Sequence, residues 1–372
     1  MANDSNAGGK QGGAAGSRNV ASQPAQGVRL KDRLPVIASF SDGPVPLPQV
    51  KAPSTEGLEV TVPAPAPLTQ DELIRRFHEL AREHAQVRDR EIGETVVLGD
   101  DVQVDVLGYC HGQLIPFSIR SNLWMELAPQ EMLPGFADAI AGSAVGDSLK
   151  VDLVLPGNYP AQSLQGMPAT FVVDLIAARE VRMPDTDSDE FLRELGRGDT
   201  HEAVMDSIAD ELLEEQADLL WLEAQHLVLD QLASRLEVEL PQSLIDDEIR
   251  RRWAAAEGEA VAEKEFSVEE QQEALGLWMK DPGTRAEVER RLRAALALKA
   301  VAERDRLQLT TEKTLELLEG SVEAFGLSPA DLREALVDPT AAAQLKNVAW
   351  HLLAVEHVMN QARVRFEGAE ES

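Results

Sequence analysis

The stretch GDSLKVDLVLPGNYPAQSLQGMPATFVVDL, residues 146–175, determines how the middle of this chain folds. Apolar residues alternate with polar ones near its start and again near its end, and Gly and Pro residues lie between the two runs. Alternation with a period of two is typical of a strand with one buried face. The stretch therefore predicts two such strands. Their alternating apolar residues are Leu149, Val151, Leu153, Phe171, Val173 and Leu175.

A third alternating run precedes this stretch, and a short helix fits between them. The run is VQVDV, residues 102–106. The helix can carry Pro134 in its first turn, where proline is tolerated, and can end at Gly142. Several strands curled about one short helix predict an α+β domain over residues 95–181.

The N-terminal part of the chain is expected to contain little regular structure. Residues 1–55 are rich in Gly, Ala, Ser and Pro, so we expect a disordered tail, and six Lys and Arg against three Asp make it weakly basic. Residues 56–94 are predicted to form a linker with a short strand at LEVTV (58–62) and a short helix. Thr69 and Glu72 have the spacing of a capping box, which places the start of this helix.

From about residue 185 the hydrophobic period becomes helical. The segment 200–237 contains neither Gly nor Pro, and its apolar residues approximate a heptad seam. Because such a helix must pack on others, we expect an all-α domain of elongated hairpins, the helical arms, over residues 185–366. The seam consists of Met205, Ile208, Leu212, Leu219, Leu222, Leu229 and Leu236, and the expected partner helices are 241–262, 284–307, 311–325, 328–336 and 340–364.

The composition disfavours several classes of partner. Hydrophobic residues make up 44% of the 372 residues and aromatic residues only 4%, so the cores must be mainly aliphatic. The formal charge of −30 argues against a nucleic-acid or membrane partner, because phosphate binding requires clustered Lys and Arg. No apolar run approaches the about 20 residues of a membrane helix, and no signal peptide is visible. With Cys110 as the only cysteine, a cytoplasmic location is expected.

The middle of the chain resembles a known family. GDDVQVDVLGYCHG (99–112), MLPGF (132–136) and residues 146–175 are, in that order, similar to the FKBP-type prolyl isomerase domain of bacterial trigger factor. The resemblance implies an FKBP-like α+β domain over residues 95–181.

The helical part extends the resemblance to the C-terminal domain of the same family. DEFLRELG (189–196) and LEVELPQSLIDDEI (236–249) resemble its opening and first arm, and VAWHLLAVEHVMNQARV (348–364) resembles its closing helix. Altogether the resemblance covers about residues 56–366. Order and spacing carry it more than any single motif.

The resemblance implies a molecular chaperone that holds unfolded or nascent polypeptides, basic clients included, in a helical cradle without ATP. Trigger factor begins with a domain whose Gly-Phe-Arg loop docks on the ribosome, and residues 1–55 contain no similar loop. We therefore expect a variant that lacks this domain and does not bind ribosomes tightly. Two alternatives stay open, an active peptidyl-prolyl isomerase and an adaptor for one folded partner. No cofactor or metal is expected.

An FKBP-type isomerase needs a dry pocket that binds the twisted X–Pro bond better than either planar form. The resemblance places the floor of this pocket at Phe136 and its backbone donor at Leu133. The apolar wall positions are Met125, Leu127 and Met132.

Three positions at which aromatic walls are expected are aliphatic in this chain. They are Val106, Ile115 and Val173. A shift of the alignment by one residue would place Phe117 and Ser118 at the second position instead. With the aliphatic walls, we expect reduced isomerase activity.

Other candidate sites have simpler explanations. DTDSDE (185–190) resembles the start of a calcium loop, but Glu190 occupies the position that needs Gly. Capping of the next helix by Ser188 or Asp187 is favoured. The His residues lack metal-ligand spacing, and Cys110 is interpreted as a small strand residue. Core positions are favoured over the cradle for four tryptophans, Trp221, Trp253, Trp278 and Trp350.

Overall fold

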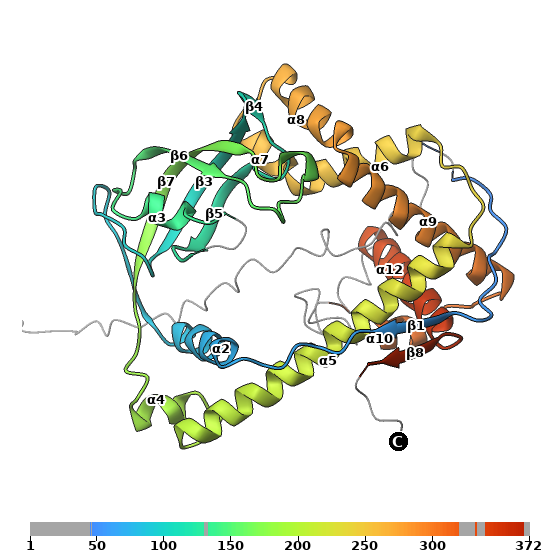
Figure 1. The fold of residues 1–372 in the computed structure, drawn as a ribbon, viewed down its shortest axis with the longest axis horizontal. Helices are drawn as coiled ribbons and strands as arrows, with labels where there is room; N and C mark the ends of the chain where they lie inside the picture. Colours follow the sequence, from blue (N-terminus) through green and yellow to red (C-terminus); the bar gives the residue numbers. More distant parts are fainter. Residues whose placement is uncertain (1–44, 46, 130–132, 320–331, 333–338, 368–372) are drawn as a thin grey trace, which may run out of the picture.

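The structure, a computed structural model, describes residues 45, 47–129, 133–319, 332 and 339–367. It contains a mixed assembly of one large sheet, one small sheet and many helices (Figure 1). In chain order the elements are β1 (Glu59–Val62), α2 (Gln70–Glu83), β2 (Gln86–Asp89), β3 (Asp101–Cys110), β4 (Gln113–Leu114), β5 (Arg120–Glu126), α3 (Phe136–Ile140), β6 (Ser148–Val154), the 3₁₀ helix η2 (Gln162–Leu164), β7 (Pro168–Arg182), α4 (Asp189–Glu194), α5 (His201–Ser234), α6 (Gln242–Ala256), α7 (Gly258–Glu263), α8 (Val268–Lys280), α9 (Pro282–Arg304), α10 (Thr311–Glu319), α12 (Pro339–Met359) and β8 (Arg363–Phe366).

The three alternating runs form neighbouring strands of the large sheet, as predicted. The sheet has the order β2-β7-β3-β4, with β5 paired to β3 and β6 paired to β7, all antiparallel. Burial alternates along β3, because every second side chain faces the core. The short helix α3 packs against β6. It begins at Phe136, two residues after Pro134, so the prediction that Pro134 lies in its first turn is wrong. Gly135, just before the helix, has a left-handed conformation with φ 84°.

The long helix α5 is held at its two ends and not along a continuous seam. Near its start, Val204 and Ile208 pack with α2 and α4; near its end, Val228 and Leu232 join the helical core. Between these ends the helix exposes apolar side chains. The predicted seam is therefore wrong in the middle of the helix, where Leu219 and Leu222 face solvent because no described helix covers them.

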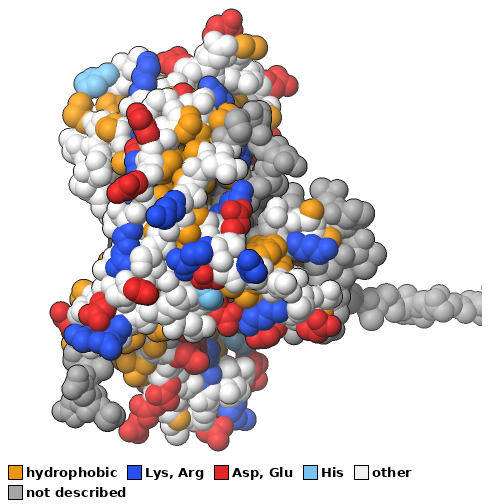
Figure 2. All heavy atoms as spheres, turned by 90° about the vertical axis from the view of Figure 1, so that its right-hand side faces the viewer, with side chains coloured by type: hydrophobic (Ala, Val, Ile, Leu, Met, Phe, Trp, Pro, Cys, Tyr) orange, Lys and Arg blue, Asp and Glu red, His pale blue; other side chains and the backbone are white. Residues whose placement is uncertain are grey.

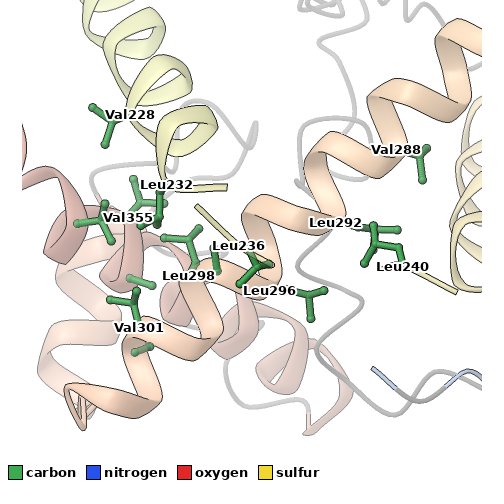
Figure 3. Packing of buried hydrophobic residues seen from close by; sticks show 14 of the residues in the cluster. Val228, Leu232, Leu236, Leu240, Val288, Leu292, Leu296, Leu298, Val301 and Val355 are labelled. Carbon is green, nitrogen blue, oxygen red and sulfur yellow. The ribbon is translucent and has the colours of Figure 1, made fainter. Parts of the chain in front are cut away.

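The main helical core lies where α5, α6, α9 and α12 meet. Figure 3 shows aliphatic side chains of α5, of the segment that follows it, of α9 and of α12 in this cluster. Helix α9 contacts α5, α6 and α12. The helical partners expected at 284–307 and 340–364 are present as α9 and α12, whereas the one expected at 241–262 is divided at Glu257 into α6 and α7. Helix α8 was not expected. The expected helix 328–336 and the end of 311–325 lie outside the described residues, apart from Leu332.

The last predicted helix ends earlier than expected, and a strand follows it. Helix α12 stops at Met359, and Arg363–Phe366 form β8, which pairs in parallel with β1. The Arg363 N–H donates to the Leu58 carbonyl at 2.8 Å, and the Glu367 N–H donates to the Val62 carbonyl at 3.0 Å. The prediction of helix up to residue 364 is thus wrong, because β1, 300 residues earlier, supplies a partner that local periodicity does not report.

The last residues of the expected tail are packed. Val45, Leu47 and Val50 lie against the helical core. Arg235 donates to the Ser54, Glu56 and Gly57 carbonyls at 2.7–2.9 Å, and Arg304 donates to the Pro53 carbonyl at 2.9 Å. The tail was expected to extend to residue 55, whereas ordered contacts begin by residue 45. Residues 1–44 are outside the described chain.

The elements form a closed circuit (Figure 1). From the large sheet, the chain passes through α4 to α5, which contacts α2 and α9; α6 then contacts α8 and α9. The circuit closes where α7 contacts β5 and α8 contacts β4. The sheet is therefore joined covalently at one end, near α2 and α4, and is held only by noncovalent contacts at the other.

Candidate functional site

The middle of α5 carries an exposed apolar surface, which we call the α5 apolar surface. It consists of Leu213, Leu219, Trp221 and Leu222. Each of these residues is between 46% and 65% exposed. Leu219 and Leu222 are three residues apart and so share one face of the helix. Leu213 and Trp221 lie on other faces of the same segment, so the exposed apolar side chains surround the helix there. Large apolar residues gathered on one exposed segment are typical of an interaction surface.

A cavity of about 330 Å³ adjoins this surface. Trp221 and Gln225 of α5 form one wall, and Leu352, Val355 and Met359 of α12 contribute apolar side chains to another. Trp221 also lies near β8, with its ring centroid 6.3 Å from that of Phe366. The cavity thus adds a concave apolar site to the α5 apolar surface.

The rim of this cavity is acidic. Glu316 of α10 and Glu356 of α12 both line it, and Lys313 lies between them, at 2.9 Å from the Glu316 carboxylate and 3.1 Å from that of Glu356. Two carboxylates share one ammonium group, so the rim keeps a net negative charge. A basic group next to an inserted apolar side chain would meet favourable charge.

A second cavity, of about 310 Å³, lies between the end of α9 and α12. Leu298, Ala302, Leu307, Trp350 and Ala354 form its apolar walls. His351 also lines it, and its Nδ1 is buried without a hydrogen-bond partner. Burial lowers the pKa of His351 to about 4, so the imidazole is neutral at pH 7. Lys299, Glu303 and Arg306 also line the cavity, which therefore has apolar walls with charged groups among them.

The predicted prolyl-pocket residues come together in one cluster of the large sheet. Val106, Ile115, Leu127, Phe136 and Val173 are all buried there, and Met125 and Leu133 pack against them. Met132 lies outside the described residues.

Phe136 is a deeply buried member of this cluster. It is 2% exposed, and its ring meets that of Phe171 edge to face, with centroids 5.9 Å apart. Val106 and Val173 are directly paired on β3 and β7. As they stand in the structure, these side chains fill the interior of the sheet.

The two residues of the alternative alignment lie elsewhere. Phe117 lies between the sheet and the helices, and its ring centroid is 4.2 Å from that of Trp278 in α8. The Ser118 hydroxyl is buried and donates to the Ile115 carbonyl at 2.7 Å. A buried aromatic that the sequence reasoning missed is Tyr159, which donates to the Pro116 carbonyl at 2.9 Å. No local pattern singles it out, because it lies in a loop.

The remaining predictions have mixed outcomes. Ser188 caps α4 by accepting from the Phe191 N–H, as expected. Trp278 is buried, but Trp221 and Trp350 are 46% and 38% exposed and line the two cavities, so the expectation of core positions is wrong for these two. Within the described ranges, no cluster of three potential metal ligands occurs. No helix among the described residues is long and apolar enough to span a membrane.

Comparison with known proteins places the helical region in a family. Residues 200–360 match the family model described as "Bacterial trigger factor protein (TF) C-terminus". This range contains the α5 apolar surface and both cavities. The chain is a relative of bacterial trigger factor.

Curated trigger factors from several bacteria extend this relationship. The protein from Novosphingobium aromaticivorans is 27% identical over 324 residues, covering 86% of this chain and 61% of that protein. That from Rhizorhabdus wittichii is 28% identical over 353 residues, covering 92% and 59%. That from Halothermothrix orenii is 25% identical over 250 residues, covering 66% and 57%. The chain thus spans about three fifths of the length of these relatives.

One solved structure also matches. It was described under the heading "Promiscuous Substrate Recognition in Folding and Assembly Activities of the Trigger Factor Chaperone", and the match has 16% sequence identity and a TM-score of 0.32, covering 84% of this chain and 72% of that one. At this TM-score the match does not bear on how the domains are arranged.

Proposed function

We propose that this trigger-factor relative is a molecular chaperone that holds unfolded or nascent polypeptides on its helical domain, residues 185–366. The observation that carries the proposal is the α5 apolar surface with its adjoining cavity, which lies inside the region of the family match. An unfolded chain presents apolar side chains on an extended backbone, and a concave apolar site can bury them. Binding of this kind needs no nucleotide.

The acidic rim suggests which clients bind best. Glu316 and Glu356 favour apolar segments with neighbouring Lys or Arg. The total charge is −30, yet the face shown in Figure 2 carries Lys and Arg side chains among the acidic ones. Attraction for basic clients therefore has to act locally at the rim. The proposed setting is the cytosol, and tight ribosome binding is not part of the proposal.

A test of this function replaces apolar side chains that support no core. Leu219→Ser with Leu222→Ser removes part of the α5 apolar surface, and both residues are exposed, so the fold should be unaffected. We expect the wild-type protein at several-fold excess to suppress aggregation of a denatured model protein, as followed by light scattering. The double variant should need several times more protein for the same effect.

The matched control is Ile92→Ser in the sheet domain, where Ile92 is 88% exposed and distant in sequence from α5. It removes an equal kind of surface and should behave as wild type. No suppression by the wild-type protein would refute the chaperone proposal. Suppression of one client and of no other in a panel would favour the adaptor alternative.

A second function is favoured by a specific observation, the gathering of seven predicted pocket residues, Phe136 among them, in one cluster. We propose that residues 95–181 form an FKBP-like domain with reduced peptidyl-prolyl isomerase activity. An enzyme of this type acts by binding and needs no acid, base or metal. Refolding of a protein whose folding is limited by proline isomerisation, with and without an unfolded competitor, measures catalysis and holding together.

A further inference from the structure

The segment Leu114–Ile119 of the sheet domain lies against the helical arm formed by α7 and α8. Its sequence is LIPFSI, and it joins β4 to β5. Leu114 and Ile119 form a buried cluster with Ala260 and Val261 of α7 and Ala274 of α8. An apolar, proline-containing segment thus occupies an apolar face of the helical domain, much as a client segment would.

Phe117 is the centre of this contact. Its ring lies 4.2 Å from the Trp278 ring, which is itself only 3% exposed. Its backbone has φ 68°, a conformation that is a clear outlier for a bulky residue. Such strain persists only where surrounding contacts hold it. The contact with Trp278 is one of those that hold this shape, together with the Ser118 and Tyr159 hydrogen bonds within the sheet domain.

Glu257 binds the backbone of the segment as well as the helical face. It is 1% exposed and lies between α6 and α7. Its carboxylate accepts from the Trp278 Nε1–H at 2.9 Å and from the Ile119 backbone N–H at 3.4 Å. A backbone N–H is present in every polypeptide, so this acceptor does not require a particular client sequence.

Charged contacts at the edge of the face hold the sheet domain in place. Lys264, just after α7, lies 2.5 Å from the Asp105 carboxylate and 3.2 Å from that of Asp174. Glu263 accepts from the Ser121 hydroxyl, and from the Asn122 side-chain amide at 3.0 Å. These side chains are partly exposed, and contacts of this kind are weak individually. They form a latch beside the Phe117–Trp278 contact, through which the sheet core and the main helical core meet.

The connectivity permits the latch to open. The sheet domain joins the rest of the chain only through the segments at β2 and at the end of β7, beside α2 and α4 (Figure 1). The α7–α8 contact is at the other end of the sheet domain, where η2 also contacts α9. Two adjacent strands can act as a hinge while the distant contact separates.

We propose that α7 and α8 form a second polypeptide-binding face, which Leu114–Ile119 occupies in cis until an unfolded segment of the same apolar, aromatic chemistry displaces it. This inference rests on the proposed chaperone function and adds to it a site that the closed molecule conceals. The tethered segment has a high effective concentration, so a free peptide competes poorly with it. Weakening the latch therefore raises the apparent affinity for a client.

The test uses the full chain and a labelled peptide with the sequence of residues 112–121, GQLIPFSIRS. Lys264→Glu replaces two attractions with two repulsions and should open the latch. We expect its Kd for the peptide, measured by fluorescence anisotropy, to be at least about tenfold lower than that of wild type. The peptide with its Phe replaced by Ala should bind both proteins weakly. Hydrogen exchange of residues 114–119 and 258–263 should become faster in the variant.

Two further variants serve as controls. Asp174→Lys combined with Lys264→Glu restores a pair of opposite charges and should return both measurements towards wild type. Lys150→Glu makes the same change of charge at an exposed ion pair with Asp152, on the same sheet but away from the latch. It should change neither the peptide affinity nor the hydrogen exchange. Thermal unfolding checks that each variant is folded. If Lys264→Glu is not folded, Phe117→Ala opens the contact from the other side.

The outcomes separate this inference from the chaperone proposal. Faster exchange without tighter peptide binding would overturn the second face. Unchanged exchange in both Lys264→Glu and Phe117→Ala would show that the contact does not open, and would also overturn it. Failure of the wild-type protein to suppress aggregation would refute the proposed function, whereas peptide binding that depends on the latch would still establish the face.

Discussion

At the scale of single residues, burial decides what Glu257 and Phe136 can do. Both lie among apolar side chains, and neither is accessible in the closed molecule. For Glu257 the consequence is electrostatic, because an ionised carboxylate loses its hydration. For Phe136 the consequence is mechanical, because the same ring that would form a pocket floor also fills the sheet core.

Glu257 makes the stability of the protein depend on pH. Burial raises its pKa to about 6, against an ordinary value of 4.5, although Arg120 and the two N–H donors oppose the shift. The folded protein therefore binds more protons than the unfolded chain between these values, and stability falls as pH rises from about 4.5 through 6. The shift corresponds to about 2 kcal/mol of unfolding free energy lost above the higher value.

Glu257→Gln should remove this contribution. As pH rises from 4.5 to 7.5, the wild type should lose stability through the ionisation of Glu257, and the variant should not. The unfolding free energy of the variant should therefore rise relative to that of the wild type. The glutamine side chain has only one acceptor oxygen, so it loses one of the two hydrogen bonds that the carboxylate accepts. This loss lowers the unfolding free energy by about 1 kcal/mol at every pH. Urea unfolding across this pH range measures the difference. A difference that does not change with pH would contradict the assignment.

Phe136 allows a test of catalysis that does not depend on unfolding. Phe136→Ala would create a cavity and cost about 3–5 kcal/mol, so lost activity would be ambiguous. Phe136→Leu keeps most of the volume and removes the flat ring. We expect the wild type to isomerise a tetrapeptide at least about a hundredfold more slowly than an ordinary FKBP. The reason is that each 1.4 kcal/mol of lost transition-state binding lowers the rate about tenfold. The leucine variant should be slower than the wild type.

The matched control is Phe171→Leu, which alters the other ring of the edge-to-face pair; Phe171 packs against Phe136 but is not itself a predicted pocket position. It should lower stability as much as Phe136→Leu and leave isomerisation nearly unchanged. Holding of denatured protein should survive in both variants. Equal loss of activity in the two would show that core packing, and not the pocket floor, controls the rate.

At the scale of elements, α5 combines buried ends with an exposed apolar middle, to which we assign the proposed client binding. Its ends are buried in separate cores, and its middle is covered on some sides only, leaving Leu219 and Leu222 exposed. A continuous heptad pattern and an exposed apolar surface look alike in sequence, because both need Leu at helical spacing. The exposed residues are therefore informative only once the packing of each end is known.

Strands β1 and β8 show the opposite case, in which a distant partner overrides local preference. The residues after α12 alternate too briefly to identify a strand, and they follow a long helical pattern. Pairing with β1 satisfies their backbone hydrogen bonds. This small sheet ties the N-terminal linker to the helical core.

At the scale of the whole molecule, the helical domain is not a separable C-terminal piece. Residues 45–62 pack on α5, α9 and α12, and α2 packs on α5 through Phe77 and Ala81. A fragment of residues 185–372 lacks all of these contacts. We expect it to unfold at a clearly lower temperature than the full chain and to hold clients only in part.

A better-matched fragment removes only the sheet. Asp89 and Arg179 are directly paired on β2 and β7, so a two-residue Asn-Gly turn can join them in place of residues 90–178. This variant keeps β1, α2 and the helical core. It should retain most of the holding activity, and its helical domain should unfold at nearly the same temperature as in the full chain. Circular dichroism and light scattering measure both. Similar instability of the two fragments would contradict the structural role assigned to residues 45–83.

The sequence by itself determined the kind of each part of this protein. Period-two runs determined the strands β3, β6 and β7, a capping box determined the start of α2, and long helical periodicity determined α5 and its partners, because these signals depend on neighbours a few residues away. Order and spacing of short motifs were enough to identify the relationship to trigger factor. They also selected the residues that meet around Phe136.

Only the tertiary structure decided which apolar residues are covered. It placed Trp278 in the interior and left Trp221 exposed, paired β8 with β1, and brought Leu114–Ile119 against α7 and α8. Each of these outcomes depends on contacts between residues far apart in the chain. Hydrophobicity drives burial without specifying the partner, so the sequence pattern is the same for a core residue, a client-binding residue and a residue covered by another domain.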